Sequence, residues 1–387
     1  MSEAGVLESG TATALSMSGP SGNLDRRADI DSKQEQITKL LAERGWEGLL
    51  LMEPANVAWF TSGATVRGLC PDWDQPAVLI TPTQRWLLAS NAESQRLFDE
   101  ELDGLGFMLK EWQWDWRRDY MLRSLAQAKR LASDRPYLEL PSVADWLAER
   151  RRCLTAYEQA CSKQLAEVVV HAVEAACRNC QPRETEREVA GQVAHRLLRR
   201  GAWPLHISVS ADGRSQRYRR QGFTAVPIER WCVVSATARK YGLHVSATRT
   251  VSFGPVEPRV KEAHANACKV QAALTAASWP DAIVGEVFQA ARRIYGLIGA
   301  EHEWHSAPIG YVLGREPVEA VVYPDSSEAM QAGWTLLWSP SVGPAITGDT
   351  ILVTPQGPVV LTSVEAWPIV LVRVSGMQIQ LPGILER

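Results

Sequence analysis

Long helical periods that alternate with strand-like segments are the feature that most constrains the fold of this chain. Apolar residues recur at helical spacing over residues 156–179, and a second helix is predicted after Thr185, whose hydroxyl and following acids suit a helix amino terminus. Segments with strand character follow at residues 206–213, 230–238 and 244–254. This order predicts antiparallel strands covered by a pair of helices, as in α+β folds.

The same kind of order returns further along the chain. Helical spacing covers residues 260–277 and 279–299, and strand-like segments cover residues 335–342, 349–357 and 358–362. Because such helices and strands need each other to bury their apolar faces, we expect one α+β domain over residues 154–387.

The amino-terminal part of the chain predicts a second, smaller α/β domain over residues 31–153. Its expected elements are a helix at 32–44 ended by Gly45, strands at 48–52, 76–82 and 85–90, a loop at 53–63, and helices at 92–101 and 118–132. The segment WQWDW at 112–116 is predicted to pack at a domain or subunit interface. Residues 1–30 are rich in Ser, Gly, Ala and Thr and are predicted to form a disordered tail.

Charge and composition disfavour several classes of partner. The chain has a net charge of −3 and a pI near 6.2, which argues against an extended nucleic-acid face. No apolar stretch reaches the roughly 18 residues that a membrane-spanning helix needs. The amino terminus lacks the basic start and apolar run of a secretion signal, so a cytoplasmic location is expected.

Cys177 and Cys180 lie in an apolar helical run and are interpreted as buried free thiols.

Four segments in a fixed order resemble one protein superfamily. They are EPANVAWFTSG at 53–63, RETEREVAGQVAHRLLRRGA at 183–202, ARKYGLHVSATRTVSFG at 238–254 and GWTLLWSPSVGPAITGDTILVTPQGPVVLT at 333–362. Together they resemble the Xaa-Pro aminopeptidases, prolidases, creatinase and methionine aminopeptidase. The resemblance implies a creatinase-like amino-terminal domain and a carboxy-terminal domain with the pita-bread fold.

The same resemblance implies a site for two metal ions in active members, held by two Asp, one His and two Glu. Carried over residue by residue, these ligand positions hold Ser235, Ser246, Ala307 (or Pro308 if the loop shifts by one residue), Ser339 and Gly348. None offers a carboxylate or an imidazole, and neutral side chains cannot balance about four positive charges. We therefore expect a degenerate site with no metal and no other cofactor.

Other residues are expected around the same pocket. Arg220 stands where some members have a histidine, and Arg249, Tyr311, Arg315, Glu316 and Asp349 are expected as neighbours. Arg249, Arg315 and Glu316 are predicted to form a structural ion pair beneath the pocket. Alternatively, Arg220, Arg249 or Arg315 would hold a carboxylate ligand through paired hydrogen bonds.

Three functional hypotheses follow. The first is a pseudoenzyme that binds a small molecule, peptide or partner protein in the old cavity, in a possible homodimer. The second is a metal-independent, creatinase-like hydrolase of a small amide, amidine or amino-acid derivative, with His305 or His244 as candidate base. The third is an active Xaa-Pro peptidase with a site rebuilt from other acids: Asp212, Glu301, Glu303, Glu316 or Asp325.

Overall fold

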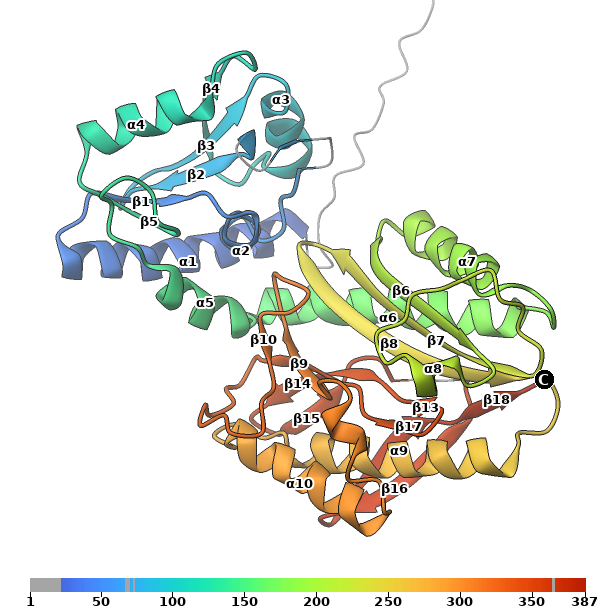
Figure 1. Cartoon of the computed structure of the whole chain (residues 1–387). Helices are drawn as coiled ribbons and strands as arrows, with labels where there is room; N and C mark the ends of the chain where they lie inside the picture. Colours follow the sequence, from blue (N-terminus) through green and yellow to red (C-terminus); the bar gives the residue numbers. More distant parts are fainter. Residues whose placement is uncertain (1–21, 67–69, 72–73, 364–365) are drawn as a thin grey trace, which may run out of the picture.

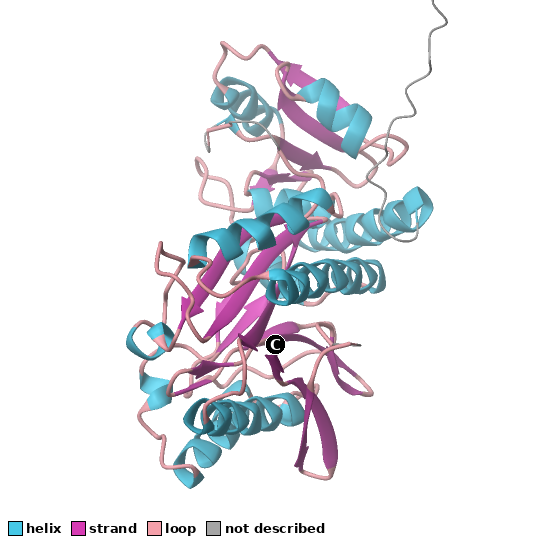
Figure 2. Cartoon of the chain, turned by 90° about the vertical axis from the view of Figure 1, so that its right-hand side faces the viewer, coloured by secondary structure: helices cyan, strands magenta, loops and turns pink. Residues whose placement is uncertain are grey.

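The computed structural model describes residues 22–66, 70–71, 74–363 and 366–387. These residues form two domains that lie one above the other in both views (Figure 1, Figure 2). Helix α5 (Ala144–Arg152) ends the amino-terminal domain, and the long helix α6 (Ala156–Asn179) begins the carboxy-terminal one. The mixed helix and strand content in two domains confirms the predicted α+β class.

The amino-terminal domain is built on a five-stranded sheet with the order β4-β3-β2-β1-β5. Its strands are β1 (Gly48–Leu51), β2 (Ala77–Ile80), β3 (Arg85–Ser90), β4 (Met108–Trp112) and β5 (Leu131–Ser133). Its other helices are α1 (Gly22–Arg44), α2 (Pro54–Phe60), α3 (Ser94–Arg96), the π-helix η2 (Leu97–Glu101) and α4 (Arg118–Ala128). Leu49 and Leu51 belong to one apolar cluster, and Leu50 and Met52 to another, as strand alternation requires of a sheet covered on both faces.

The carboxy-terminal domain contains a nine-stranded sheet. Its main order is β10-β9-β11-β14-β8-β7-β6, and the two other strands pair outside that order, β15 with β14 and β18 with β8. Its strands are β6 (Trp203–Ala211), β7 (Trp231–Lys240), β8 (Leu243–Ser252), β9 (Gly310–Leu313), β10 (Ala320–Val321), β11 (Thr335–Trp338), β12 (Ser341–Val342), β13 (Ala345–Ile346), β14 (Asp349–Thr354), β15 (Gly357–Val360), β16 (Ile369–Val374), β17 (Met377–Pro382) and β18 (Ile384–Glu386). Its further helices are α7 (Glu186–Arg199), α8 (Arg214–Arg217), α9 (Pro258–Ala277), α10 (Val284–Leu297) and the 3-10 turn η3 (Glu303–His305).

Two helix pairs cover this sheet (Figure 1). Helices α6 and α7 share an apolar cluster with β7 and β8, while α9 and α10 share another with β9, β11 and β14. Both α6 and α7 begin with a capping box, in which Thr155 and Thr185 accept from the backbone of Glu158 and Glu188. The predicted cap at Thr185 is therefore confirmed. Cys177 and Cys180 are buried free thiols, also as predicted.

The start of the first helix was predicted wrongly. Helix α1 begins at Gly22, so residues 22–30 of the expected tail are helical; the tail's residues 1–21 lie outside the described residues. Contacts with distant parts of the chain stabilise these first turns. The buried Arg26 guanidinium donates two hydrogen bonds to the Thr61 carbonyl, and Ile30 is fully buried. Local composition carries no sign of those contacts.

Other local predictions also failed where tertiary packing decided the outcome. The segment 53–63, expected as a loop, contains helix α2, which begins with Pro54 at its first turn and is almost wholly buried. The predicted helix at 118–132 ends at Ala128, and its last residues belong to strand β5. The predicted helix at 92–101 is the short α3 followed by a π-helical turn. The hairpin of β16 and β17 was not predicted.

Within the part of the chain that the structure describes, no helix is both long and apolar enough to span a membrane.

The residues of the WQWDW segment differ in burial: Trp112 is buried at the end of β4, whereas Trp114 and Trp116 are exposed. The homodimer stays a prediction.

Candidate functional site

The hairpin of β7 and β8 places the first two expected ligand positions on one face of the sheet. Alternate residues of β7 and β8, such as Val234 and Val245, lie in the cluster under α6 and α7. Ser235 and Ser246 therefore belong to the opposite face. There the Ser235 hydroxyl lies 2.8 Å from the Thr248 hydroxyl, and the Thr237 hydroxyl donates to Ser246 at 3.0 Å.

Two further positions lie beside this hydroxyl cluster. Ser339 follows β11 and Gly348 precedes β14, strands that pair with each other. The backbone N–H of Thr248 donates to the Gly348 carbonyl at 2.8 Å. A β-carbon added at Gly348 would lie 2.7 Å from the Thr248 hydroxyl oxygen and 3.4 Å from that of Ser339. Gly348 thus joins Ser235 through Thr248, with Ser339 beside it, and a side chain at position 348 would require the Thr248 hydroxyl to move.

The fifth position, Ala307, comes shortly before β9, the strand that pairs with β11. It stands two residues before Ile309, whose carbonyl accepts a hydrogen bond of 2.8 Å from the Ser339 backbone. Ala307 lines an open groove of about 860 Å³, and Pro308, the alternative position, lines it too. The same groove is lined by Arg220, His305 and Tyr323 among others.

The chemistry of these positions decides whether they could hold the two divalent metal ions of the implied site. Three of them offer only neutral hydroxyl groups, and Ala307 and Gly348 offer no side-chain donor. Across the described ranges, no group of three or more His, Cys, Asp or Glu side chains is placed to hold a metal ion. The residues present do not fit a pair of hard cations, which require several carboxylate oxygens.

The acids of the third hypothesis have other partners. Asp212 accepts hydrogen bonds from the backbone N–H groups of Glu229, Arg230 and Trp231. Glu303 forms a buried ion pair with Arg219. Together with Glu301, Glu316 and Asp325 they form no such metal-binding group among the described residues.

Arg249 does not face the hydroxyl cluster. It belongs to the other face of β8 and is buried beneath the sheet, where its Nε lies 3.1 Å from Glu174 and its Nη1 lies 3.0 Å from Asp349. The same guanidinium donates to the carbonyls of Thr248 and Thr362. The predicted pairing of Arg249 with Arg315 and Glu316 is wrong, because residue order within a motif does not show which face a side chain occupies.

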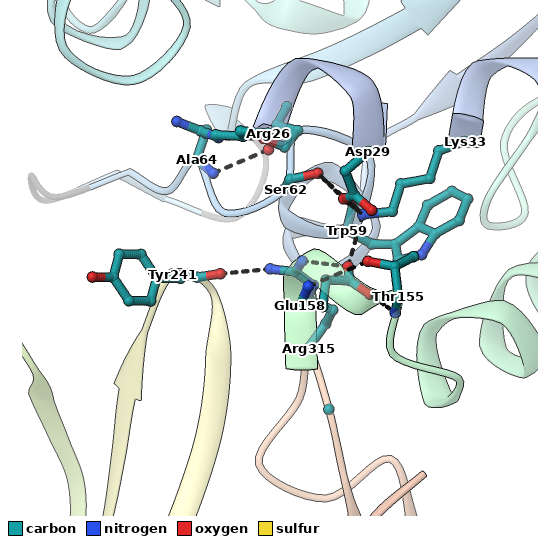
Figure 3. A network of polar contacts seen from close by, with 12 residues as sticks. Arg26, Asp29, Lys33, Trp59, Ser62, Ala64, Thr155, Glu158, Tyr241 and Arg315 are labelled. Carbon is teal, nitrogen blue, oxygen red and sulfur yellow. Dashed lines mark hydrogen bonds and ion pairs between the residues drawn. The ribbon is translucent and has the colours of Figure 1, made fainter. Parts of the chain in front are cut away.

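Arg315 belongs to a network between the two domains (Figure 3). Its Nη2 binds the carboxylate of Glu158 on α6, and its Nη1 donates to the Tyr241 carbonyl at 2.6 Å. Glu158 also accepts from the fully buried Lys33 of α1 at 2.7 Å. Burial raises the pKa of Glu158, but the charges of Lys33 and Arg315 outweigh it and hold that pKa at about 2.

The remaining expected neighbours take separate places. Glu316 is exposed, and it lies 3.8 Å from Arg151 rather than paired with Arg249. Asp349 is buried and accepts from Gln271 and Thr362 as well as Arg249. Tyr311 lies half-buried on β9, opposite Leu337 of β11.

The two candidate bases differ in exposure. His244 is buried on β8, in the interior of the sheet, and its Nδ1 lies 3.0 Å from the Gly314 carbonyl. Burial lowers the pKa of His244 to about 4, so the ring is neutral near pH 7. His305 is exposed and stacks on Trp304 with ring centres 3.6 Å apart. Its side chain has no hydrogen-bond partner in the described part of the chain.

The neutral His244 predicts a dependence of stability on pH. Because the ordinary histidine pKa of 6.5 applies after unfolding, the unfolded chain binds a proton that the folded chain refuses between pH 6.5 and about 4. The free energy of unfolding should therefore fall as the pH is lowered through this window, by about 1.4 kcal/mol per pH unit for this one group. Urea unfolding at a series of pH values measures the slope.

His244→Asn, which keeps a donor for the Gly314 carbonyl, should make this slope shallower. His302→Asn, at an exposed histidine, is the matched control and should leave the slope unchanged. Equal slopes for wild type and His244→Asn would contradict a neutral His244 in the folded chain.

The packing at Gly348 gives a second prediction. Gly348→Ala should lower the free energy of unfolding by about 1–3 kcal/mol, because the new methyl group meets the Thr248 hydroxyl. Adding Thr248→Ala should remove most of that cost in a double-mutant cycle. Gly191→Ala, where an added β-carbon meets nothing within 4 Å, is the control and should not destabilise. An additive cycle would show that Thr248 does not fill the space at position 348.

Both the sequence and the fold of the chain resemble those of known proteins. The profile of metallopeptidase family M24 matches residues 160–362. No curated protein matches the sequence. A prolidase structure from Pyrococcus horikoshii is similar with a TM-score of 0.73 and 19% identity, covering 86% of this chain and 99% of that one.

Two further structures resemble the chain over most of its length. An X-Pro aminopeptidase from Thermotoga maritima has a TM-score of 0.75 and 18% identity, with 92% of this chain and 99% of that chain covered. The amino-terminal domain of the FACT complex subunit SPT16 from Cicer arietinum has a TM-score of 0.64 and 12% identity, with 89% and 97% covered. At these identities the similarity shows the fold alone.

Proposed function

The chain belongs to metallopeptidase family M24, and from that premise we propose that it is a member without dinuclear-metal peptidase activity that acts by binding a peptide or small molecule. The observation that carries this proposal is the hydroxyl cluster of Ser235, Ser246 and Ser339 beside Gly348. The hydroxyl groups of Ser235 and Ser246 contact those of Thr248 and Thr237, and the Thr248 hydroxyl lies 2.7 Å from where a β-carbon at position 348 would stand.

The groove beside Ala307 is the proposed binding surface. Its wall carries Arg219 and Arg220, with the rings of Trp304 and Tyr323 nearby. Arg219 is engaged by Glu303 and by the carbonyls of Ser215 and Gly343, whereas the exposed Arg220 has no side-chain partner among the described residues. A guanidinium near aromatic rings suits a ligand with a carboxylate and an apolar or aromatic part. The FACT subunit domain with a similar fold is a component of a complex, by its own description.

The test is metal binding and peptide hydrolysis by the full chain. Isothermal titration with Mn²⁺ or Co²⁺ should show no stoichiometric binding, and dipeptides with proline at the second position should not be cleaved above a protein-free blank. A prolidase assayed in parallel is the positive control. About two bound ions together with hydrolysis would overturn the proposal. A peptide library should show binders that Arg220→Gln weakens and Arg187→Gln, at an exposed arginine of α7, does not.

A metal-independent hydrolase is the second candidate function, because His305 lines the same groove as Ala307 and Arg220. In this case the imidazole would act as a general base toward a small amide or amidine. Turnover without metal that His305→Ala abolishes and His302→Ala preserves would favour it. Peptide binding without turnover would favour the binding protein.

A further inference from the structure

A second cavity lies between the two domains, away from the groove beside Ala307. Its volume is about 280 Å³, and it shares no lining residue with that groove. Helix α2 and the segment around η2 form its apolar wall, with Val57, Leu97 and Leu102 among the side chains. The turn between β7 and β8 closes the other side, where Gly242 lies so near α2 that an added β-carbon would be 3.0 Å from Ala58.

Two arginines bring unsatisfied donors to this mostly apolar cavity. Arg239, near the end of β7, lines it and is partly buried, yet its side chain has no hydrogen bond or ion pair with any described residue. Burial lowers the pKa of Arg239. Arg315 lines the cavity too; its terminal nitrogens are engaged, but its Nε is buried without a hydrogen-bond partner. Burying a cation without a counter-charge or hydrogen-bond acceptors is costly. The other buried arginines have such partners: Arg26 donates to the Thr61 carbonyl, and Arg249 pairs with the Asp349 carboxylate.

We propose that this cavity binds a small organic carboxylate with an apolar body. The carboxylate accepts paired hydrogen bonds from Arg239, since guanidinium and carboxylate groups match in shape and charge. The aliphatic wall receives the apolar body of the ligand. The volume is near the lower end of the range for ligand pockets, which restricts the ligand to a small acid.

Such a ligand would contact both domains. Arg239 comes from the carboxy-terminal domain, and Val57, Leu97 and Leu102 come from the amino-terminal one. Binding to the folded chain raises stability in proportion to the logarithm of ligand concentration above Kd. The ligand therefore stabilises the arrangement of the two domains. This site is independent of the proposed function, because it uses none of the residues of the groove.

The test is isothermal titration and thermal unfolding of the full chain with four probes: hexanoate, benzoate, hexanamide and inorganic phosphate. Hexanoate or benzoate should bind and raise the Tm, and hexanamide, of the same shape without the charge, should bind at least roughly tenfold more weakly. Phosphate, which has the charge without the apolar body, should also bind more weakly. Failure of both acids to bind, or equal binding of hexanoate and hexanamide, would overturn the proposal. Phosphate that binds as tightly as hexanoate would overturn the apolar part of it.

Variants identify the residue. Arg239→Gln should weaken hexanoate binding at least roughly tenfold, and Arg239→Lys, which keeps the charge without the planar fork, should lie between it and wild type. Arg187→Gln is the control at an exposed arginine and should bind as wild type. Circular dichroism establishes that each variant is folded, and Arg239→Lys serves if Arg239→Gln is not. Hexanoate affinity unchanged by a folded Arg239 variant would place the ligand elsewhere.

Discussion

Lys33→Met is expected to lower the free energy of unfolding by about 3–5 kcal/mol, the cost of removing one partner from a buried ion network. The Lys33 ammonium is completely buried and binds the carboxylates of Asp29 and Glu158 at 2.6 and 2.7 Å. The Trp59 carbonyl and the Ser62 hydroxyl also lie within hydrogen-bond distance of this ammonium, so methionine removes the donor that four oxygens share. Urea unfolding followed by circular dichroism measures the loss.

Two comparisons sharpen this test. Lys39→Met removes an exposed lysine from the same helix and should change stability by less than about 0.5 kcal/mol. Glu158→Gln added to Lys33→Met should cost less than the sum of the single changes, because the two charges share one network. A Lys33→Met variant as stable as Lys39→Met would contradict the network between the domains.

Acid should weaken the same network. Since Lys33 and Arg315 hold the pKa of Glu158 at about 2, below the ordinary value of 4.5, the stabilisation from this carboxylate is complete above pH 4.5. It is lost as the pH falls from 4.5 toward 2. In Lys33→Met the loss should still begin near pH 4.5, the value of the unfolded chain, but it should end at a higher pH and be smaller, because one of the two cations that lower the pKa of Glu158 is gone.

Arg249→Met is expected to destabilise the carboxy-terminal domain by a similar amount, about 3–5 kcal/mol. The guanidinium is buried between Glu174 and Asp349 and also satisfies the carbonyls of Thr248 and Thr362. Methionine would leave two buried carboxylates with less compensation. Thermal and urea unfolding of the purified variant measure the effect.

Arg249→Lys distinguishes charge from shape. A lysine keeps the charge but lacks the planar fork that reaches two carboxylates and two carbonyls, so it should restore only part of the stability. Arg199→Met, at an exposed arginine of α7, is the matched control and should remain close to wild type. If Arg249→Met were as stable as that control, the buried network would not hold the sheet to α6.

Some residues of the candidate site could be placed from the sequence, and others could not. The hairpin of β7 and β8 follows from local alternation, which places Ser235 and Ser246 on the same face. The proximity of Ser339 and Gly348 to them depends on strand pairing over about a hundred residues, which the family resemblance suggested and the structure describes. The roles of Arg249 and Arg315 were not predictable, because their partners lie 75 and 157 residues away.

The sequence by itself determined what depends on neighbours along the chain: the helical and strand periods, the cap at Thr185, and the neutral residues at the expected ligand positions. Only the tertiary structure decided that Thr248 fills the space beside Gly348, that Arg249 lies beneath the sheet, and that Arg239 faces a cavity between domains. The physical reason is that helix and strand periods arise from short-range interactions. Burial and charge pairing depend instead on which distant segments pack together, and no local pattern records that choice.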